Sequence, residues 1–330
     1  MILPLKAEKI RRLKEVCLSK ITSAFPLHSR MHLMQTLPFY VKREDELGFG
    51  ISGSKLRKYA SILPFLKRER KCVALIGSPY SNHILSFIQL LKQEGIPFLV
   101  FLEKTRSGSP KGNFFLLSLL LQKKEIVWVD ELPSDVTRSF WEEKVGQSFL
   151  WVPMGGCMEE GLLGSLTLPL DILKNEEDFS LVFDHVFVDA GTGMSAIALI
   201  LGFAYLQKKT KVHVVLMAGD EESFTVQLQA FHLFLQEELA EKFLLPKQSY
   251  QLHYPCSAKS FGSTNATVFK TIVETAKQEG IFLDPIYTAK LLLTVKKKAP
   301  SGNVLWIHSG GALSLFGFQE PLLHLSSEIL

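Results

Sequence analysis

The stretch HVFVDAGTGMS, residues 185 to 195, decides the fold class. Residues 185 to 188 form a short apolar run, which predicts a buried strand. A glycine-rich turn, Gly191 to Ser195, follows this strand, and an apolar helix is expected to begin near Ser195. A strand that passes through a tight turn into a helix is the repeating unit of a parallel sheet covered by helices.

Strands and helices of the same kind alternate along the rest of the chain. The expected strands span residues 39–42, 73–76, 98–102, 126–129, 185–188, 212–217 and 304–307. The expected helices include residues 55–67, 82–93, 113–122, 195–207 and 266–278. These strands are continuous apolar runs, without the alternation of a half-exposed antiparallel sheet. The sequence therefore predicts an α/β fold whose parallel sheets carry helices on both faces.

Two domains are expected from the length of 330 residues. The glycine-rich stretch from Met154 to Gly164 is the expected crossing from one domain to the other. A second crossing is expected just after Lys55, so that one domain is inserted in the other. We therefore expect a large domain of residues 1–58 plus 163–330, and an inserted small domain of residues 59–162.

The composition excludes several classes of protein. An apolar fraction of 47% and a charged fraction of 21% are typical of a globular protein with a sizeable core. The net charge is only +4 and the basic residues are scattered, which argues against a nucleic-acid partner. The four cysteines form no CxxC pair, which argues against a zinc cage and a disulfide framework. Without a secretory signal or an apolar run of roughly 20 residues, we expect a cytoplasmic protein with no membrane partner and no metal.

The turn from Gly191 to Ser195 has the features of a phosphate cradle. Its glycines let backbone N–H groups approach an anion, and the helix that follows adds a favourable dipole. A dinucleotide fingerprint ending at Ala196 is a second interpretation, and a tight turn without a ligand is a third. The dinucleotide motif normally opens the first strand–helix unit and has an acidic residue about 20 residues later. Here the turn lies past the middle of the chain, and Asp220 comes later than that spacing.

Two lysines, Lys55 and Lys58, stand at the expected start of a helix, where the helix dipole disfavours cations. They require an anionic ligand or a lowered pKa, unless they are simply a pair of exposed lysines. A desolvated lysine near another cation becomes a neutral amine that can form an imine. A lysine imine and a phosphate handle together describe pyridoxal phosphate.

Ser81, Asn82 and His83 follow another expected strand and begin a helix. Serine and asparagine are common helix caps, so capping alone explains the first two residues. Their hydroxyl and amide groups are also suited to bind a substrate carboxylate, and His83 can add a hydrogen bond. Tyr287 lies in a loop that opens at Asp284, where a lone tyrosine usually serves packing.

Eight motifs in order carry a resemblance to a known family. They are KRED at 42–45, SKLRK at 54–58, SNH at 81–83, KGN at 111–113, PMGG at 153–156, GTGMS at 191–195, DPIYT at 284–288 and HSGG at 308–311. Over residues 35 to 318 the chain resembles the D-cysteine desulfhydrase and aminocyclopropane-carboxylate deaminase family. These fold-type II enzymes are relatives of the tryptophan synthase β subunit. The resemblance implies a two-domain fold with pyridoxal 5'-phosphate between the domains, and a homodimer.

The resemblance also implies a role for each matched residue. Lys55 would form a Schiff base with the cofactor and move the α-proton of the substrate. The phosphate would be held by Lys58, Gly191, Thr192, Gly193, Met194 and Ser195. Asn82 would contact the ring hydroxyl of the cofactor, and Thr288 its ring nitrogen. Five residues would meet the substrate: Ser81, Asn82, His83, Phe261 and Tyr287.

Position 288 separates the branches of the family. The cyclopropane deaminases resemble this chain but have a glutamate there, which can keep the ring nitrogen protonated and the ring strongly electron-withdrawing. Thr288 is neutral and suits a reaction in which a β-leaving group departs as the α-proton is lost. The desulfhydrase branch also has a histidine after Ser-Asn, as at His83. The resemblance therefore favours β-elimination over ring opening.

Five residues depart from the family pattern. Ser54 stands in place of asparagine, Met194 in place of a second glycine, Cys157 in place of serine and Leu85 in place of arginine. Phe261 occupies the place of a second active-site tyrosine on the substrate side. The lost hydroxyl removes a possible proton donor near the substrate.

The expected reaction is β-elimination on a small amino acid, from D-cysteine to pyruvate, ammonia and hydrogen sulfide. Lys55, Ser81 and Tyr287 are its expected catalytic residues. Within the family, aminocyclopropane-carboxylate deaminase-like activity and amino-acid racemase or deaminase activity stay open. A cofactor-binding protein without catalysis is a further alternative, because of Phe261 and Met194. A nucleotide-dependent oxidoreductase that uses the Gly191 turn is the alternative outside the family.

Overall fold

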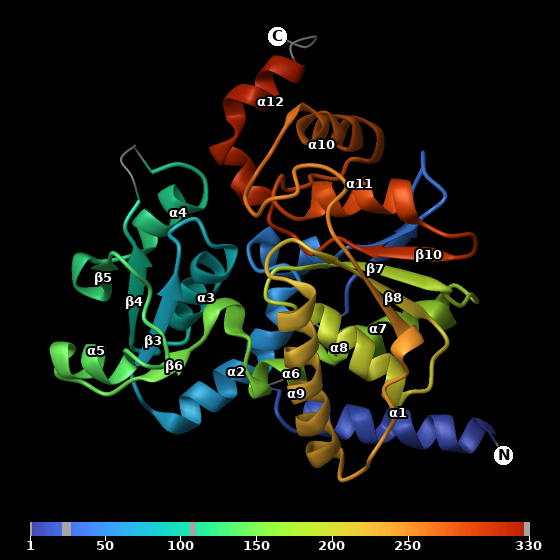
Figure 1. Ribbon diagram of the computed structural model, residues 1–330, viewed down its shortest axis with the longest axis horizontal. Coiled ribbons are helices and arrows are strands. Elements are labelled where there is room, and N and C mark those ends of the chain that lie inside the picture. Colours follow the sequence, from blue (N-terminus) through green and yellow to red (C-terminus); the bar gives the residue numbers. More distant parts are fainter. Residues whose placement is uncertain (1, 22–27, 106–109, 327–330) are drawn as a thin grey trace.

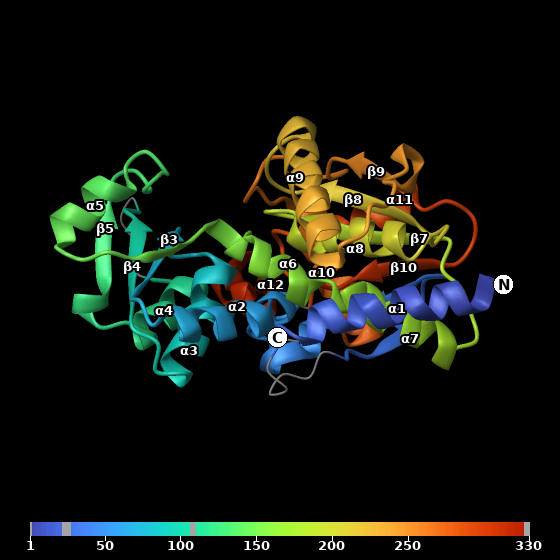
Figure 2. The same ribbon diagram turned by 90° about the horizontal axis from the view of Figure 1, so that it is seen from below.

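The computed structural model describes residues 2–21, 28–105 and 110–326. Within these ranges the strands form two separate sheets, one of six strands and one of four. Figure 1 shows the four-stranded sheet with its helices at one end of the molecule and the larger sheet at the other. Helices lie on both faces of each sheet, as Figure 2 shows from a second direction. The α/β prediction is confirmed.

The six-stranded sheet combines strands from both ends of the chain. Its strand order is β1 (Met31–Leu33), β2 (Tyr40–Lys42), β10 (Val304–Ile307), β7 (His185–Ala190), β8 (Lys211–Leu216) and β9 (Tyr250–His253). β1 pairs with β2 in antiparallel fashion, and the other neighbours are parallel. The last strand in sequence, β10, therefore lies between β2 and β7.

Alternate residues of the central strands enter two different cores. Val186 and Val188 of β7 pack against one layer of helices, whereas Phe187 packs against the other. The first layer contains α1 (Ile2–Leu18), α6 (Glu159–Ser165), α7 (Thr167–Asp178), α8 (Met194–Tyr205) and α9 (Glu221–Leu239). The second contains α10 (Ala266–Glu279), α11 (Thr288–Lys298) and α12 (Gln319–Ser326). Burial on both faces explains why these strands are continuous apolar runs.

The four-stranded sheet is parallel and has the order β5 (Ile126–Val129), β4 (Phe98–Glu103), β3 (Val73–Gly77) and β6 (Leu150–Val152). One face packs on α2 (Lys55–Glu69), α3 (Asn82–Gln93) and α4 (Asn113–Leu120), and the other on α5 (Arg138–Val145). Short 3-10 segments complete the description at η1 (Glu44–Gly50), η2 (Lys123–Glu125), η3 (Met154–Gly156), η4 (Lys247–Ser249) and η5 (Ala312–Gly317). All four strands fall inside residues 59–162, while the exact domain boundaries stay a prediction.

All seven expected strands are present, and those at 126–129 and 304–307 have the expected bounds. The prediction missed β1, β6 and β9. β1 and β6 have only three residues each, which is too short for a periodic signal. β9 is an edge strand without a fully buried residue, so its apolar pattern is weak.

A buried group of charges anchors helix α2. Arg57 pairs with Glu44 at 2.6 Å and with Asp171 of α7 at 2.7 Å. Lys42 of β2 also bonds Asp171, and Asn175 at 2.6 Å. These five side chains are almost fully buried, so the position of α2 is fixed against β2, η1 and α7.

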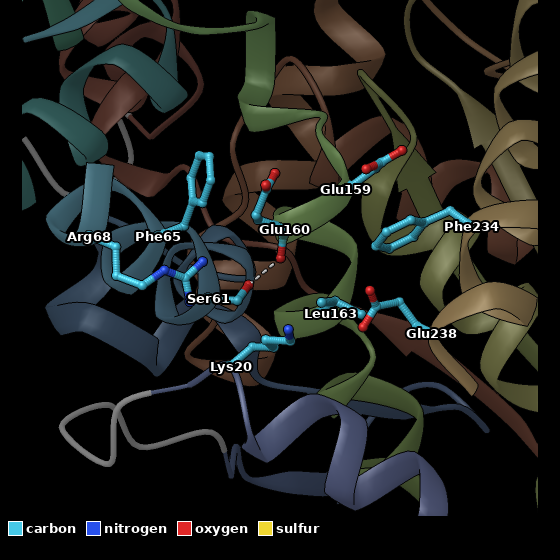
Figure 3. A pocket seen from close by; sticks show the side chains of 9 residues that line it. All are labelled: Lys20, Ser61, Phe65, Arg68, Glu159, Glu160, Leu163, Phe234 and Glu238. Atoms are coloured by element: carbon cyan, nitrogen blue, oxygen red, sulfur yellow. Dashed lines mark hydrogen bonds between the residues drawn. The ribbon is translucent and has the colours of Figure 1, made fainter. Parts of the chain in front are cut away.

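Helix α2 also packs closely against α6. A Cβ on Gly164 would lie 2.1 Å from the carbonyl oxygen of Arg57, so only glycine permits this approach. Further along the two helices, a cavity of about 180 Å³ opens between α2, α6 and α9. Figure 3 shows Ser61 and Arg68 of α2 on one side of it and Phe234 of α9 on the other. This cavity contains none of the residues that the sequence motifs singled out.

Among the described residues, no helix combines the length and the apolar character that crossing a bilayer would need.

Candidate active site

The polar loops predicted from the sequence follow the carboxyl ends of strands from both sheets. The Gly191 turn follows β7, and the loop 308–311 follows β10. In the smaller sheet, Ser81 follows β3, and η3 follows β6. Ligands of parallel α/β sheets bind outside these ends.

Close contacts at glycines show that these loops meet. A Cβ on Gly155 of η3 would lie 2.4 Å from Oγ1 of Thr192, across the two sheets. A Cβ on Gly311 would lie 3.1 Å from Nδ2 of Asn82. The lack of side chains therefore lets loops from the two sheets come together around one site.

Lys55 and Lys58 occupy the first turn of α2 at this site. Burial lowers the pKa of Lys55, while the carboxylates of Asp189 and Asp284 oppose the shift. Burial, together with the neighbouring charge of Lys55, lowers the pKa of Lys58 to about 7. Nζ of Lys58 donates to the carbonyl of Gly155. The lowered pKa expected for two lysines at this helix start is therefore present.

Two carboxylates beside Lys55, the half-buried Asp189 and the fully buried Asp284, were not predicted as site residues. Burial raises the pKa of Asp189 to about 6, although a hydrogen bond from Ser309 acts to lower it. In the described part of the chain, Oδ1 of Asp189 has no hydrogen-bond partner. Asp284 is fully buried, and burial raises its pKa although the backbone N–H groups of residues 286–288 donate to it. Its position as an acidic residue at the end of an apolar strand could have identified Asp189 as a site residue from the sequence.

The Gly191 turn fits an anion. Gly193 has a φ of +84° just before α8, and the first N–H groups of a helix lack partners within the helix. Met194 is only 2% exposed and packs into the core, so it offers the site only its backbone. Its substitution for glycine thus leaves the turn intact. Sγ of Cys157 donates to the carbonyl of Thr192 at 3.4 Å, which ties η3 to the same turn.

The residues Ser81, Asn82 and His83 lie together at the start of α3. Ser81 caps the helix, and its hydroxyl accepts from the backbone of His83 at 3.2 Å. Oδ1 of Asn82 accepts from Nδ2 of Asn113 at 2.6 Å, which fixes the amide. A Cβ on Gly156 would lie 3.2 Å from Cε1 of His83, so the imidazole borders the site. Both interpretations of Ser81, cap and site residue, are compatible with this position.

Tyr287 and Thr288 lie at the start of α11, on the larger sheet's side of the site. A Cβ on Gly191 would lie 3.2 Å from Cε1 of Tyr287, so the tyrosine covers the turn. The hydroxyl of Thr288 is buried, donates to Oδ1 of Asp284 at 2.8 Å and accepts from the N–H of Asp284. Phe261 is 61% exposed, with its ring centre 6.2 Å from that of Tyr287. Phe261 therefore lies at the rim.

These residues fit pyridoxal phosphate. A lysine with a lowered pKa, a second lysine and a glycine turn at a helix start supply the donors for an imine and a phosphate. An unpaired, buried Nε2 of His83 and an unpaired Oδ1 of Asp189 leave polar atoms that a polar ligand can satisfy, within the ranges described. The site combines these features at the carboxyl ends of parallel strands from both sheets.

The chain belongs to the family of pyridoxal-phosphate dependent enzymes, whose model matches residues 24–310. The cofactor of this family is pyridoxal 5'-phosphate, as the site residues indicate. A relative in Pyrococcus furiosus, named provisionally a 1-aminocyclopropane-1-carboxylate deaminase, is 28% identical and covers 86% of this chain and 88% of its own. A D-cysteine desulfhydrase of Serratia proteamaculans is 25% identical and covers 92% and 96%.

Solved structures share the fold. A crystal structure of an ACC deaminase homologue superposes with a TM-score of 0.81 at 24% identity and covers 95% of this chain and 99% of its own. A threonine deaminase of Solanum lycopersicum gives 0.61 at 16% identity, with 97% and 89% covered. The fold-type II prediction is confirmed, and membership of a pyridoxal-phosphate dependent family favours the phosphate-cradle interpretation of the Gly191 turn over the nucleotide-dependent one.

Proposed function

We propose that this chain is a lyase that performs β-elimination on a small amino acid, with D-cysteine as the substrate. D-Cysteine and water would give pyruvate, ammonia and hydrogen sulfide. When bound, pyridoxal phosphate supplies the electron sink that makes loss of the α-proton possible. The similarity to D-cysteine desulfhydrases supports the proposal, while the deaminase relatives are about as similar.

The neutral hydroxyl of Thr288 is the observation that carries the proposal. Its hydrogen is engaged with Asp284, and its oxygen accepts from the backbone N–H of the same residue. As the neighbour that the resemblance implies for the ring nitrogen, this hydroxyl brings no negative charge of its own. A less electron-withdrawing ring suits a reaction in which the β-substituent leaves as the α-proton is lost.

Lys55 and Tyr287 are suited to the proton transfers. Because burial lowers the pKa of Lys55, its amine can be neutral and accept the α-proton. Burial and the carboxylate of Asp284 raise the pKa of Tyr287, so its hydroxyl stays protonated and can donate to a departing thiolate. Ser81 stands at the N-terminus of α3, where its hydroxyl and the helix N–H groups can bind the substrate carboxylate.

Phe261 favours one second candidate, a cofactor-binding protein without turnover. Its ring lies close to Tyr287 but has no hydroxyl to give or take a proton. Such a protein would bind pyridoxal phosphate and show its visible absorption, yet would not release products from any amino acid.

Product release from purified protein tests the reaction. With pyridoxal phosphate and D-cysteine, we expect sulfide and pyruvate in equal amounts. Parallel assays with D-serine, β-chloro-D-alanine, 1-aminocyclopropane-1-carboxylate and the L-isomers separate a wrong substrate from a wrong reaction. Absence of sulfide and pyruvate from D-cysteine would contradict the proposal, and absence of product from every amino acid would favour the second candidate.

Chemical reduction tests the role of Lys55 independently of turnover. Borohydride should fix the cofactor on one lysine, and peptide mapping should find the label on Lys55. Lys55→Ala should abolish the label, whereas Lys67→Ala, at the exposed end of the same helix, should keep it. A label on another lysine of the wild-type protein would refute the assignment.

We also propose that the chain forms the homodimer that the resemblance implies. Light scattering in solution should then give twice the mass of one chain, and a single-chain mass would contradict this.

A further inference from the structure

His83 is held in a packed and hydrogen-bonded position at the start of α3. Its side chain lies against the ring of Phe87, with ring centres 5.3 Å apart, and Phe87 in turn stacks on Tyr59 at 4.7 Å. Nδ1 of His83 lies 2.8 Å from the hydroxyl of Tyr59, which lies 2.9 Å from the hydroxyl of Ser86. We call Ser86, Tyr59 and His83 the buried chain. All three residues are at most 4% exposed.

The number of hydrogens in the buried chain fixes the tautomer of His83. The third contact joins Ser86 Oγ to the carbonyl oxygen of Asn82 at 2.6 Å. Each of the three contacts needs one hydrogen, because two lone pairs at such distances repel each other. Ser86 and Tyr59 supply one hydrogen each, and a carbonyl supplies none. The third hydrogen must therefore sit on Nδ1 of His83.

This assignment also satisfies each group in turn. Ser86 donates to the carbonyl of Asn82, Tyr59 donates to Ser86, and Nδ1–H of His83 donates to Tyr59. The longer contacts of Ser86 and Tyr59 to the His83 carbonyl, at 3.3 and 3.4 Å, share the same hydrogens. Burial, with Lys58 and Lys55 nearby, lowers the pKa of His83 well below its usual value, so the ring keeps one proton.

The other ring nitrogen, Nε2, then carries no proton, and its lone pair borders the site. It is buried, and within the described ranges no protein group bonds it. The adjacent ring atom Cε1 lies 3.2 Å from a Cβ built on Gly156, and the Lys58 side chain lies 3.7 Å from the same point. A buried acceptor without a partner is costly, so a ligand that brings a donor gains from this position.

We propose that Tyr59 and Ser86 are positioning residues that fix His83 as the Nδ1–H tautomer, so that Nε2 recognises a hydrogen-bond donor on the β-substituent of the amino-acid substrate. The inference rests on the proposed function, because it takes an amino acid as the ligand. A carboxylate and a phosphate dianion offer only acceptors and are repelled by this lone pair. The site therefore selects S–H or O–H side chains over alkyl and thioether side chains.

The tautomer is measurable without turnover. Ring-¹⁵N histidine labels each of the nine histidines, and long-range ¹H–¹⁵N spectra separate protonated from unprotonated ring nitrogens. His83→Gln identifies the resonances of His83. We expect a proton on Nδ1 and none on Nε2 in the wild-type protein with cofactor. A proton on Nε2 instead would overturn the proposal.

Two variants test the chain that sets the tautomer. Ser86→Ala removes the acceptor of the Tyr59 hydrogen, which then turns to Nδ1 and forces the His83 proton onto Nε2. Tyr59→Phe removes the acceptor of Nδ1–H and gives a mixture of tautomers. Ser165→Ala is the matched control, since Ser165 is also buried and bonds a carbonyl of its own helix at 2.7 Å. An unchanged His83 tautomer in Ser86→Ala would refute the role of the chain.

Ligand binding to the loaded protein tests the donor. Either enantiomer of serine should shift the Nε2 resonance of His83, whereas alanine of the same hand should not. Ser86→Ala should weaken serine binding about tenfold and leave alanine binding unchanged, the factor expected for one lost hydrogen bond. Equal responses to serine and alanine, or none to either, would overturn the donor assignment. A failure of D-cysteine turnover alone would refute the proposed reaction and leave these spectra as they are.

Discussion

Lys55 and Lys58 lie one helical turn apart. Their charges should affect the stability of the cofactor-free protein and of the cofactor-bound protein in opposite ways. Lys58 is buried and Lys55 is half-buried, and burial lowers the pKa of each. Without an anion, a buried ammonium at Lys58 destabilises the fold, because it has lost its water and faces a second cation. We propose that a phosphate bound in the Gly191 turn would give the same ammonium a partner. The free energy of unfolding should therefore depend on both pH and cofactor.

Lys58→Met should raise the thermal stability of the cofactor-free protein and weaken its affinity for pyridoxal phosphate. Unfolded Lys58 titrates near pH 10.4, whereas folded Lys58 titrates at about 7. Between these values the unfolded state binds more protons, so wild-type stability should rise with pH, and the variant should lack the part of that rise that Lys58 contributes. Scanning calorimetry between pH 7 and 10 measures the stability of both proteins and its dependence on pH. At pH 7 the Tm of Lys58→Met should exceed that of the wild type by at least about 2 °C.

Lys67→Met is the control for this prediction. Lys67 lies on the same helix but forms an exposed pair with Glu94, so its loss should change stability by less than about 1 kcal/mol. If Lys58→Met is less stable than the wild type without cofactor, the interpretation of Lys58 as a buried, unfavourable charge is wrong.

At the scale of elements, α2 is held by two unlike contacts. Its first turns carry Arg57 into the buried charges of Glu44 and Asp171, and its backbone touches α6 at Gly164. One contact is electrostatic and the other is steric. Both fix the helix that carries Lys55, and each can be removed separately.

Asp171→Asn should destabilise the protein by about 3–5 kcal/mol near neutral pH, because Arg57 and Lys42 would lose a buried counter-charge. Burial alone would raise the pKa of Asp171, but Arg57 and Lys42 hold it below its usual value. The ion pairs of Asp171 with Arg57 and Lys42 thus contribute stability above about pH 4, which is lost as the pH falls below that value. Urea unfolding should show the two proteins converging in acid. Asp135→Asn, in an exposed pair with Arg138, should change little.

Gly164→Ala should push α6 away from α2 and lower both stability and cofactor affinity. The new Cβ would lie 2.1 Å from the Arg57 carbonyl and 2.5 Å from Oγ of Ser61. Overpacking of this kind costs about 1–3 kcal/mol. Gly317→Ala is the control, since its Cβ would meet only ordinary contacts at 3.6 Å or more. Titration of pyridoxal phosphate by absorbance, with thermal melts, measures both effects, and similar results for the two variants would contradict the prediction.

The sequence predicted the central strands well, because burial on both faces produces continuous apolar runs. It also predicted the loops of the site, since polar residues at the ends of such strands share one edge. It did not predict the partners that long-range packing supplies. Tyr59 and Ser86 are 27 residues apart and meet only when α2 packs on α3. Asp171 joins Lys42 across 129 residues, which no local pattern reveals.

At the scale of the whole molecule, the site joins loops of both sheets. Pyridoxal phosphate should therefore stabilise the two sheets together. The gain should be about 2.7 kcal/mol when the cofactor concentration is a hundred times its Kd. Amide hydrogen exchange should slow at residues 78–83 and 191–195 in parallel when the cofactor is added. Protection of only one of these segments would contradict a site shared by the two sheets.

The place of β10 has a consequence for the order in which a newly made chain folds. β10 pairs with β2 across 265 residues, between Tyr40 and Leu305, and it also pairs with β7. The larger sheet therefore cannot close until the last strand has left the ribosome. The smaller sheet needs only residues 73 to 152, which leave the ribosome long before β10. The molecule is thus assembled from its inserted part outward, and the site forms last.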